Sequence, residues 1–219
     1  MDQMGNYLRP TSAIDCDSES IERKAADLTR DQQEVIDKAR TIFYFVRDQV
    51  KYDLYVLSDR PEYYRASRIL DIREGFCIQK AVLLAALARA VGIPARLHLA
   101  AIRNHLVPDK LRELMGTDLF PTHGYDELCI EGKWVKATPA FDLKMCQQNR
   151  IIPVEFDGKN DAIFHSHNLE GKLHIEYVED HGHYDDLPFD KIIDLRIQEL
   201  GADFFDRARQ AIEARTARG

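Results

Sequence analysis

The segment from Ala81 to Ala88 constrains the fold most strongly, because it is apolar on every side of a helix. A helix without a polar face has to be enclosed by other elements, so we expect it at the centre of the molecule. The pattern predicts a helix from about Phe76 to Val91, which Gly92 ends and Pro94 cannot continue. Hydrophobic residues make up 45% of the 219 residues, enough for a core that surrounds such a helix.

Cys77 stands where this helix is expected to begin, directly after a glycine turn at Gly75. The N-terminus of a helix carries about half a positive charge and several unpaired N–H groups. The thiolate is the form of cysteine that attacks carbonyl carbon, and this position favours ionisation. We therefore predict that Cys77 is an ionised nucleophile in an open cleft, although an isolated buried cysteine can also be a simple core residue.

His123 begins a second expected element, because the residues that follow it alternate like a strand. Tyr125–Ile130 and Lys133–Ala137 are predicted to form a β-hairpin. A nucleophile and a base on separate rigid elements are typical of thiol acyl-transfer enzymes. The chain then continues through Thr138 and Asp142, two side chains that could orient the imidazole.

The rest of the pattern places helices first and an antiparallel sheet afterwards, which indicates an α+β fold. We interpret residues 1–219 as one domain with a loosely held N-terminal arm over residues 1–20. The further predicted helices cover Asp31–Tyr52, Ala66–Ile72, Pro108–Met115 and about 189–216, and the further strands cover Ala95–Ile102, Ile151–Phe156 and Leu173–Val178.

Charge and composition exclude several classes of function. The net charge is −7 and no basic stripe is present, so we expect no nucleic-acid partner. The longest apolar stretch, Ala81–Ile93, contains Arg89 and is too short to span a bilayer, so no membrane association is expected. No secretory signal is visible and the four cysteines show no paired spacing, which predicts reduced thiols in the cytoplasm.

Two histidine pairs raise the question of a metal site: His165 with His167, and His181 with His183. Their spacing matches no common zinc signature, and histidines in a polar segment are usually solvated. The sequence therefore predicts neither a metal nor a cofactor, and the cluster remains an open alternative.

Three motifs, in this order, resemble those of the transglutaminase-like superfamily. They are Gly75-Phe76-Cys77-Ile78-Gln79-Lys80-Ala81 with the following Gly92-Ile93-Pro94-Ala95-Arg96, then His123-Gly124-Tyr125-Asp126-Glu127, and finally Gly132-Lys133-Trp134-Val135 through Thr138-Pro139. The resemblance covers about Tyr44 to Asp142. It implies a papain-like fold, in which N-terminal helices and a central cysteine-bearing helix pack on an antiparallel sheet.

The resemblance also implies a Cys–His–Asp triad and a thioester intermediate, used for amide or peptide hydrolysis or for transfer to an amine. Cys77 and His123 match the first two members, but the family aspartate falls on Thr138. Asp142 follows four residues later, and we favour it because a carboxylate orients an imidazole better than a hydroxyl. The expected function is a cysteine protease or transglutaminase-like enzyme acting on a peptide or other amide; the alternative, suggested by Thr138, is an inactive binding module. The substrate, the acceptor and the oligomeric state stay open.

Overall fold

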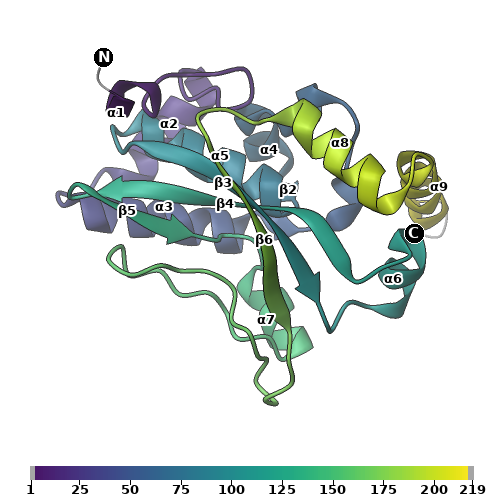
Figure 1. Cartoon of the computed structure of the whole chain (residues 1–219). Coiled ribbons are helices and arrows are strands. Elements are labelled where there is room, and N and C mark those ends of the chain that lie inside the picture. The colour runs from purple at the N-terminus through teal and green to yellow at the C-terminus, as the bar shows by residue number, and fades with distance from the viewer. Residues whose placement is uncertain (1–2, 217–219) are drawn as a thin grey trace.

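Helix α5 (Cys77–Ala90) lies at the centre of the structure, where its apolar sequence predicts it. The computed structural model describes residues 3–216. Every residue of α5 from Cys77 to Arg89 is buried, with helices on one side and a sheet on the other (Figure 1). The predicted α+β fold, in which a cysteine-bearing helix packs on an antiparallel sheet, is confirmed.

The main sheet has four strands in the order β5-β4-β3-β6, and every neighbouring pair is antiparallel. These strands are β3 (Ala95–Asn104), β4 (Leu119–Ile130), β5 (Lys133–Ala137) and β6 (Ile175–Tyr184). In β3, Ala100 pairs with His123 of β4 and with Asp180 of β6. The predicted hairpin and the predicted strand from Ala95 are therefore confirmed, while β6 joins the sheet from far along the chain.

The helices form two groups around this sheet. Helices α2 (Glu19–Thr29), α3 (Val35–Gln49) and α4 (Ala66–Ile72) contact α5. Helices α6 (Asp109–Met115), α8 (Phe189–Leu200) and α9 (Phe204–Thr216) gather at one end of the sheet (Figure 1). The remaining elements are α1 (Gln3–Asn6), the 3₁₀ helices η1 (Leu54–Val56) and η2 (Pro61–Tyr64), α7 (Leu143–Asn149), and a small parallel pair formed by β1 (Lys51–Tyr52) and β2 (Glu74–Gly75).

The N-terminal arm is more firmly held than its polar sequence predicts. Ile14 is fully buried, and the carboxylate of Asp15 accepts the backbone N–H of Ser67 at 3.0 Å. The helix expected from Asp31 begins instead at Val35. Helix α2, which the sequence analysis did not predict, precedes it and packs against α5.

Two further predictions in the C-terminal half are wrong. Residues 151–156 form no strand, because they pair with no neighbouring strand, although Phe156 is buried in the core. The single helix expected over about 189–216 is divided at Gly201, whose φ of 92° lies outside the helical region. The division lets α9 turn back and contact α6.

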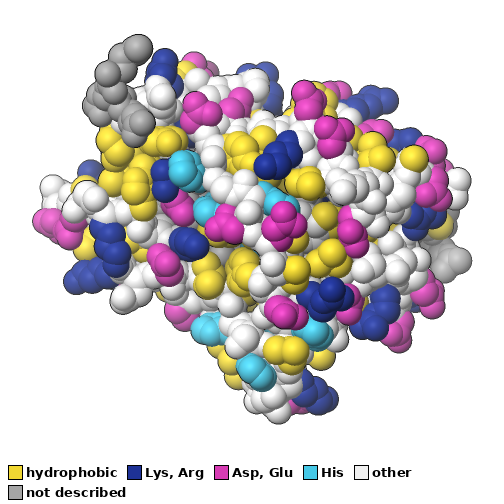
Figure 2. Space-filling view, viewed as in Figure 1, with side chains coloured by type: hydrophobic (Ala, Val, Ile, Leu, Met, Phe, Trp, Pro, Cys, Tyr) yellow, Lys and Arg dark blue, Asp and Glu magenta, His cyan; other side chains and the backbone are white. Residues whose placement is uncertain are grey.

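The face of the sheet opposite the helices is a mixed surface on which acidic, basic, histidine and hydrophobic side chains alternate (Figure 2). On this face, His98 of β3 forms a small polar network, with Nδ1 3.0 Å from Glu127 of β4 and Nε2 2.7 Å from Asp180 of β6. The network connects three neighbouring strands through one imidazole. Within residues 3–216, no helix combines the length and the apolar character that crossing a bilayer requires.

Candidate active site

Cys77 is the first residue of α5, and the turn that carries it is fixed by Gln79. The Gln79 carboxamide accepts the N–H of Phe76 at 3.2 Å and donates to the carbonyl of Tyr63 at 2.9 Å. A buried side chain with both of its polar groups satisfied has little freedom to move. The backbone around the thiol is therefore held in place from both sides.

Strand β4 approaches this turn closely because residue 124 is a glycine. A Cβ atom on Gly124 would lie 2.8 Å from Cγ1 and 3.0 Å from Cα of Ile78. The close approach brings the backbone N–H of Gly124 to the sulfur of Cys77 and lowers the pKa of the thiol. Only a residue without a side chain fits at position 124, because β4 packs directly against the turn that carries Cys77.

Burial nevertheless dominates the ionisation of both groups. Cys77 is 8% exposed, and its burial raises the pKa of the thiol despite the opposing effects of the Gly124 N–H and the Arg196 guanidinium. Burial also lowers the pKa of His123 to about 3. The expectation of an ionised thiol is therefore not met in this arrangement, because desolvation outweighs the helix terminus and leaves a neutral thiol and a neutral imidazole.

His123 lies on β4 and is enclosed by aromatic rings. Its ring centroid is 4.8 Å from that of Phe164 and 5.8 Å from that of Tyr125. The buried Nε2 atom makes no hydrogen bond with any residue that the structure describes. Cys77 and His123 line the same cavity, which Phe141 also borders, so the structure brings these two predicted residues to one site.

Thr138 and Asp142 occupy different environments. Thr138 directly follows β5, is 1% exposed, and its hydroxyl lowers the pKa of the neighbouring Tyr177, which burial raises to about 12. Asp142 is the N-cap of α7: one carboxylate oxygen accepts the N–H of Met145 at 2.8 Å and the other accepts the N–H of Tyr52 at 2.9 Å. Both oxygens of Asp142 thus have backbone donors.

An Asp142→Ala variant is expected to lower the free energy of unfolding by about 1–2 kcal/mol, since it removes a helix N-cap together with the link to Tyr52. Urea denaturation followed by circular dichroism measures this loss. Asp142→Asn keeps one acceptor oxygen and should lose less stability than Asp142→Ala. Equal stability of wild type and Asp142→Ala would contradict the capping role.

The chain matches the family model of the Transglutaminase-like superfamily over residues 22–139, more than half of its length. It belongs to this superfamily. A crystal structure of a candidate cysteine protease from Cytophaga hutchinsonii is similar with a TM-score of 0.56 and 18% identity, over 88% of this chain and 50% of that one. A candidate protease from Parabacteroides distasonis gives a TM-score of 0.40 and 16% identity, over 62% of this chain and 25% of the other. No curated protein matches significantly.

This transglutaminase-like chain spans about half the length of the Cytophaga protein, and at 18% identity the likeness establishes the fold alone. The match over residues 22–139 also stops before α7, β6, α8 and α9. Whatever these C-terminal elements add to the site must therefore be derived from this structure itself.

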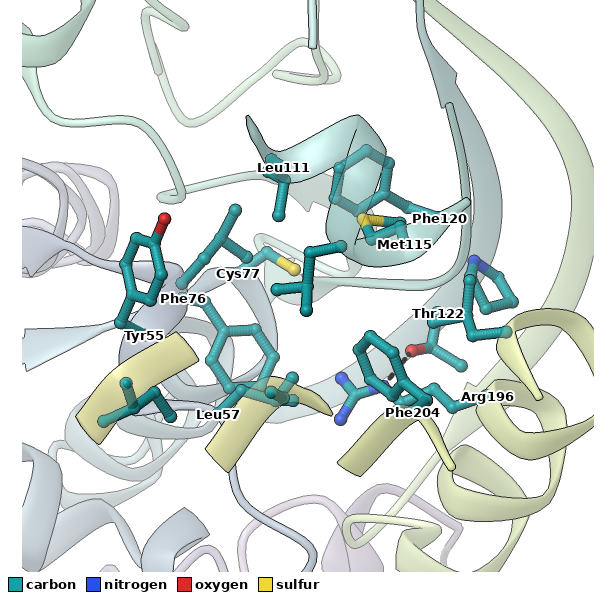
Figure 3. A pocket seen from close by; sticks show the side chains of 16 residues that line it. Tyr55, Leu57, Phe76, Cys77, Leu111, Met115, Phe120, Thr122, Arg196 and Phe204 are labelled. Atoms are coloured by element: carbon teal, nitrogen blue, oxygen red, sulfur yellow. Dashed lines mark hydrogen bonds between the residues drawn. The ribbon is translucent and has the colours of Figure 1, made fainter. Parts of the chain in front are cut away.

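A second pocket beside Cys77 is lined mainly by residues between 54 and 122, and helices α8 and α9 complete it. Its walls are apolar, with Leu57, Leu111 and Phe204 among the residues that line it (Figure 3). Arg196 of α8 also lines this pocket, and the sequence analysis did not identify it. A signal was present, because Arg196 stands four residues from both Ile192 and Leu200 on the buried stripe of the helix.

The histidine pairs show no metal geometry. Within residues 3–216, no three His, Cys, Asp or Glu side chains lie close enough together to hold a metal ion. His181 Nε2 lies 3.0 Å from the carbonyl oxygen of Pro121, and His167 Nδ1 lies 3.0 Å from the hydroxyl of Ser166. Local hydrogen bonds thus account for one histidine of each pair.

Proposed function

We propose that this transglutaminase-like protein is a thiol-dependent amide hydrolase, with Cys77 as nucleophile and His123 as proton carrier. The observation that carries the proposal is the position of Cys77: it begins α5, faces the N–H of Gly124 and shares a cavity with His123. Such an arrangement supplies a nucleophile, a base and backbone donors in one enclosed space.

In the proposed reaction, the sulfur of Cys77 attacks the amide carbonyl carbon while its proton passes to His123. Backbone N–H groups at the start of α5 stabilise the oxyanion. The carbon–nitrogen bond breaks as His123 gives the proton to the leaving amine, which leaves a thioester on Cys77. A water molecule that loses its proton to His123 then cleaves the thioester, and the proton returns to the departing thiol.

Neutral resting groups fit this order of events. A neutral imidazole can accept the proton of a neutral thiol when an electrophile enters the cavity. We propose Thr138 rather than Asp142 as the group that orients His123, because both Asp142 oxygens already accept backbone N–H groups. The buried hydroxyl of Thr138 has no hydrogen-bond partner among the described residues, so it is available to the imidazole. If Asp142 oriented the ring instead, Asp142→Asn would slow the reaction of Cys77 more than Thr138→Val.

Iodoacetamide near neutral pH is expected to modify Cys77 before Cys16, Cys129 and Cys146, because Cys77 borders two cavities. A His123→Ala variant should slow this modification at least about tenfold, because the imidazole that accepts the thiol proton during the attack is lost. The rate should keep rising with pH beyond the usual cysteine range, since burial raises the pKa of Cys77. Peptide mapping by mass spectrometry at timed intervals measures each rate.

His174→Ala is the matched control. His174 is also a buried histidine, its pKa is lowered by burial to about 4, and its ring lies 6.1 Å from that of Phe141. If His123→Ala and His174→Ala slow the modification of Cys77 equally, the loss of a buried ring explains the effect, and His123 has no specific role as proton carrier.

A binding module without catalysis is the second candidate, favoured by Thr138 at the position of the family aspartate. Its expected result is a Cys77 that reacts no faster than Cys129 and is insensitive to His123→Ala. That result would refute the hydrolase proposal.

A further inference from the structure

Arg196 is a buried cation without an acidic partner among residues 3–216. It is 4% exposed. Its Nε donates to the hydroxyl of Thr122 at 2.9 Å, and its Nη1 donates to the hydroxyl of Tyr64 at 3.0 Å. Both partners are neutral, and the Phe76 ring, whose centroid lies 5.3 Å from the guanidinium carbon, adds a cation–π contact but no negative charge. The described residues therefore do not balance the charge of Arg196.

The guanidinium borders the same pocket as the candidate nucleophile. The sulfur of Cys77 points into this pocket, and Arg196 forms part of its wall (Figure 3). The other walls are mainly apolar, formed by residues such as Leu111, Met115 and Phe120. A buried charge in apolar surroundings is costly unless an opposite charge completes the site. The pocket is therefore complementary to an anion.

The thiol of Cys77 does not supply this opposite charge permanently. Arg196 lowers the pKa of Cys77, but burial has the larger effect and raises it, so the thiol is neutral near pH 7. The charge of Arg196 is therefore available to a ligand in the resting protein.

We propose that Arg196 binds a carboxylate of the substrate, so that the substrate cleaved at Cys77 carries a negative charge close to the cleaved amide. This proposal rests on the proposed function, because it places the acyl donor at Cys77. A guanidinium can donate two parallel N–H bonds to a carboxylate, and the apolar walls strengthen the attraction by excluding water. The carboxylate belongs either to an acidic side chain or to a chain terminus.

Two alkylating reagents with the same reactive group test the proposal without a known substrate. N-bromoacetyl-glycine carries a carboxylate, whereas N-bromoacetyl-glycinamide is neutral and of nearly the same size. The measured quantity is the ratio of their rates at Cys77, divided by the same ratio for free cysteine. We expect wild type to favour the carboxylate reagent about tenfold or more, the effect of one charge-assisted hydrogen bond.

Arg196→Gln should bring this ratio to the free-cysteine value, and Arg196→Lys should retain part of the preference. Lys191→Gln is the matched control, since it removes an exposed positive charge from the same helix. Its ratio should equal that of wild type. The melting temperature of each variant verifies folding, and Arg196→Lys keeps the test valid if Arg196→Gln does not fold.

A second reagent pair, N-bromoacetyl-glutamic acid α-amide and N-bromoacetyl-glutamine α-amide, tests a side-chain carboxylate against the terminal one. A wild-type ratio equal to that of free cysteine for both pairs would overturn the proposal. A fall of both rates in Arg196→Gln with an unchanged ratio would also overturn it, because Arg196 would then act only on the thiol. If neither reagent modifies Cys77 ahead of the other cysteines, the proposed hydrolase function fails, and this proposal with it.

Discussion

Replacement of Lys80 by alanine is expected to lower the free energy of unfolding by about 3–5 kcal/mol. Lys80 lies inside α5, is 0% exposed, and donates to the carbonyls of Arg47 at 2.9 Å and Val50 at 2.6 Å. Those carbonyls belong to the end of α3, so one ammonium group joins the two helices. The variant loses a buried side chain and leaves two buried acceptors without a donor. Urea denaturation measures the loss.

Lys80→Met separates the two contributions, because methionine fills most of the volume but donates no hydrogen bond. It should be more stable than Lys80→Ala and less stable than wild type. Lys144→Ala is the control at an exposed lysine of α7, where a change within about 0.5 kcal/mol is expected. A Lys80→Met variant as stable as wild type would show that the two carbonyls do not need this donor.

Lys80 should also make stability depend on pH in a defined direction. Burial lowers the pKa of Lys80 to about 7, whereas an unfolded lysine titrates at about 10.4. Between these values the unfolded state binds more protons, so this group makes the folded state more stable as the pH rises from about 7 to 10. The stability of wild type relative to Lys80→Met should therefore increase with pH across this window and be constant below it. A decrease would contradict the lowered pKa.

A Gly124→Ala variant is expected to lower the free energy of unfolding by about 1–3 kcal/mol. The new methyl carbon would lie 2.8 Å from Cγ1 and 3.0 Å from Cα of Ile78, which is closer than van der Waals contact allows. Separation of β4 from α5 would also move the Gly124 N–H away from the sulfur of Cys77. The pKa of the thiol should then rise further, and iodoacetamide should modify Cys77 more slowly. Thermal denaturation and timed mass spectrometry measure the two effects.

Gly5→Ala is the control for this substitution. Apart from the adjacent residues and the backbone of α1 itself, no described atom lies within 4 Å of the position of a Cβ on Gly5, so the same chemical change meets no clash. Because Gly5 lies in α1, alanine should be neutral or stabilising there. A Gly124→Ala protein with wild-type stability and reactivity would show that β4 can shift without affecting the cysteine turn.

The elements that sequence predicts well are those specified by local pattern. Helix α5 is apolar all round and follows a glycine turn, and both features act within a few residues. The Lys133–Ala137 hairpin strand is similarly defined by a tight turn at Gly132, whose φ is 80°. By contrast, residues 151–156 have strand-like composition, but a strand also requires a neighbour, and none is present.

The residues of the candidate site also differ in how well the sequence predicts them. The motif around Cys77 and strand β4, which carries His123, place these two residues at one cavity. The ionisation of Cys77 could not be predicted, because it depends on how much water the surrounding chain excludes. Arg196 was missed because it comes from α8, and its proximity to Cys77 depends on the path of the whole C-terminal third.

The order of strands in the sheet has a consequence for biosynthesis. Strand β3 is paired on one edge by β4, which follows soon after it, but its other edge is covered only by β6 (Ile175–Tyr184). During translation β3 therefore presents an open edge until most of the polypeptide has left the ribosome, and such edges invite association with other chains. Helix α8, which carries Arg196, is synthesised later still. Cys77 therefore leaves the ribosome well before the helices that complete the pocket around it.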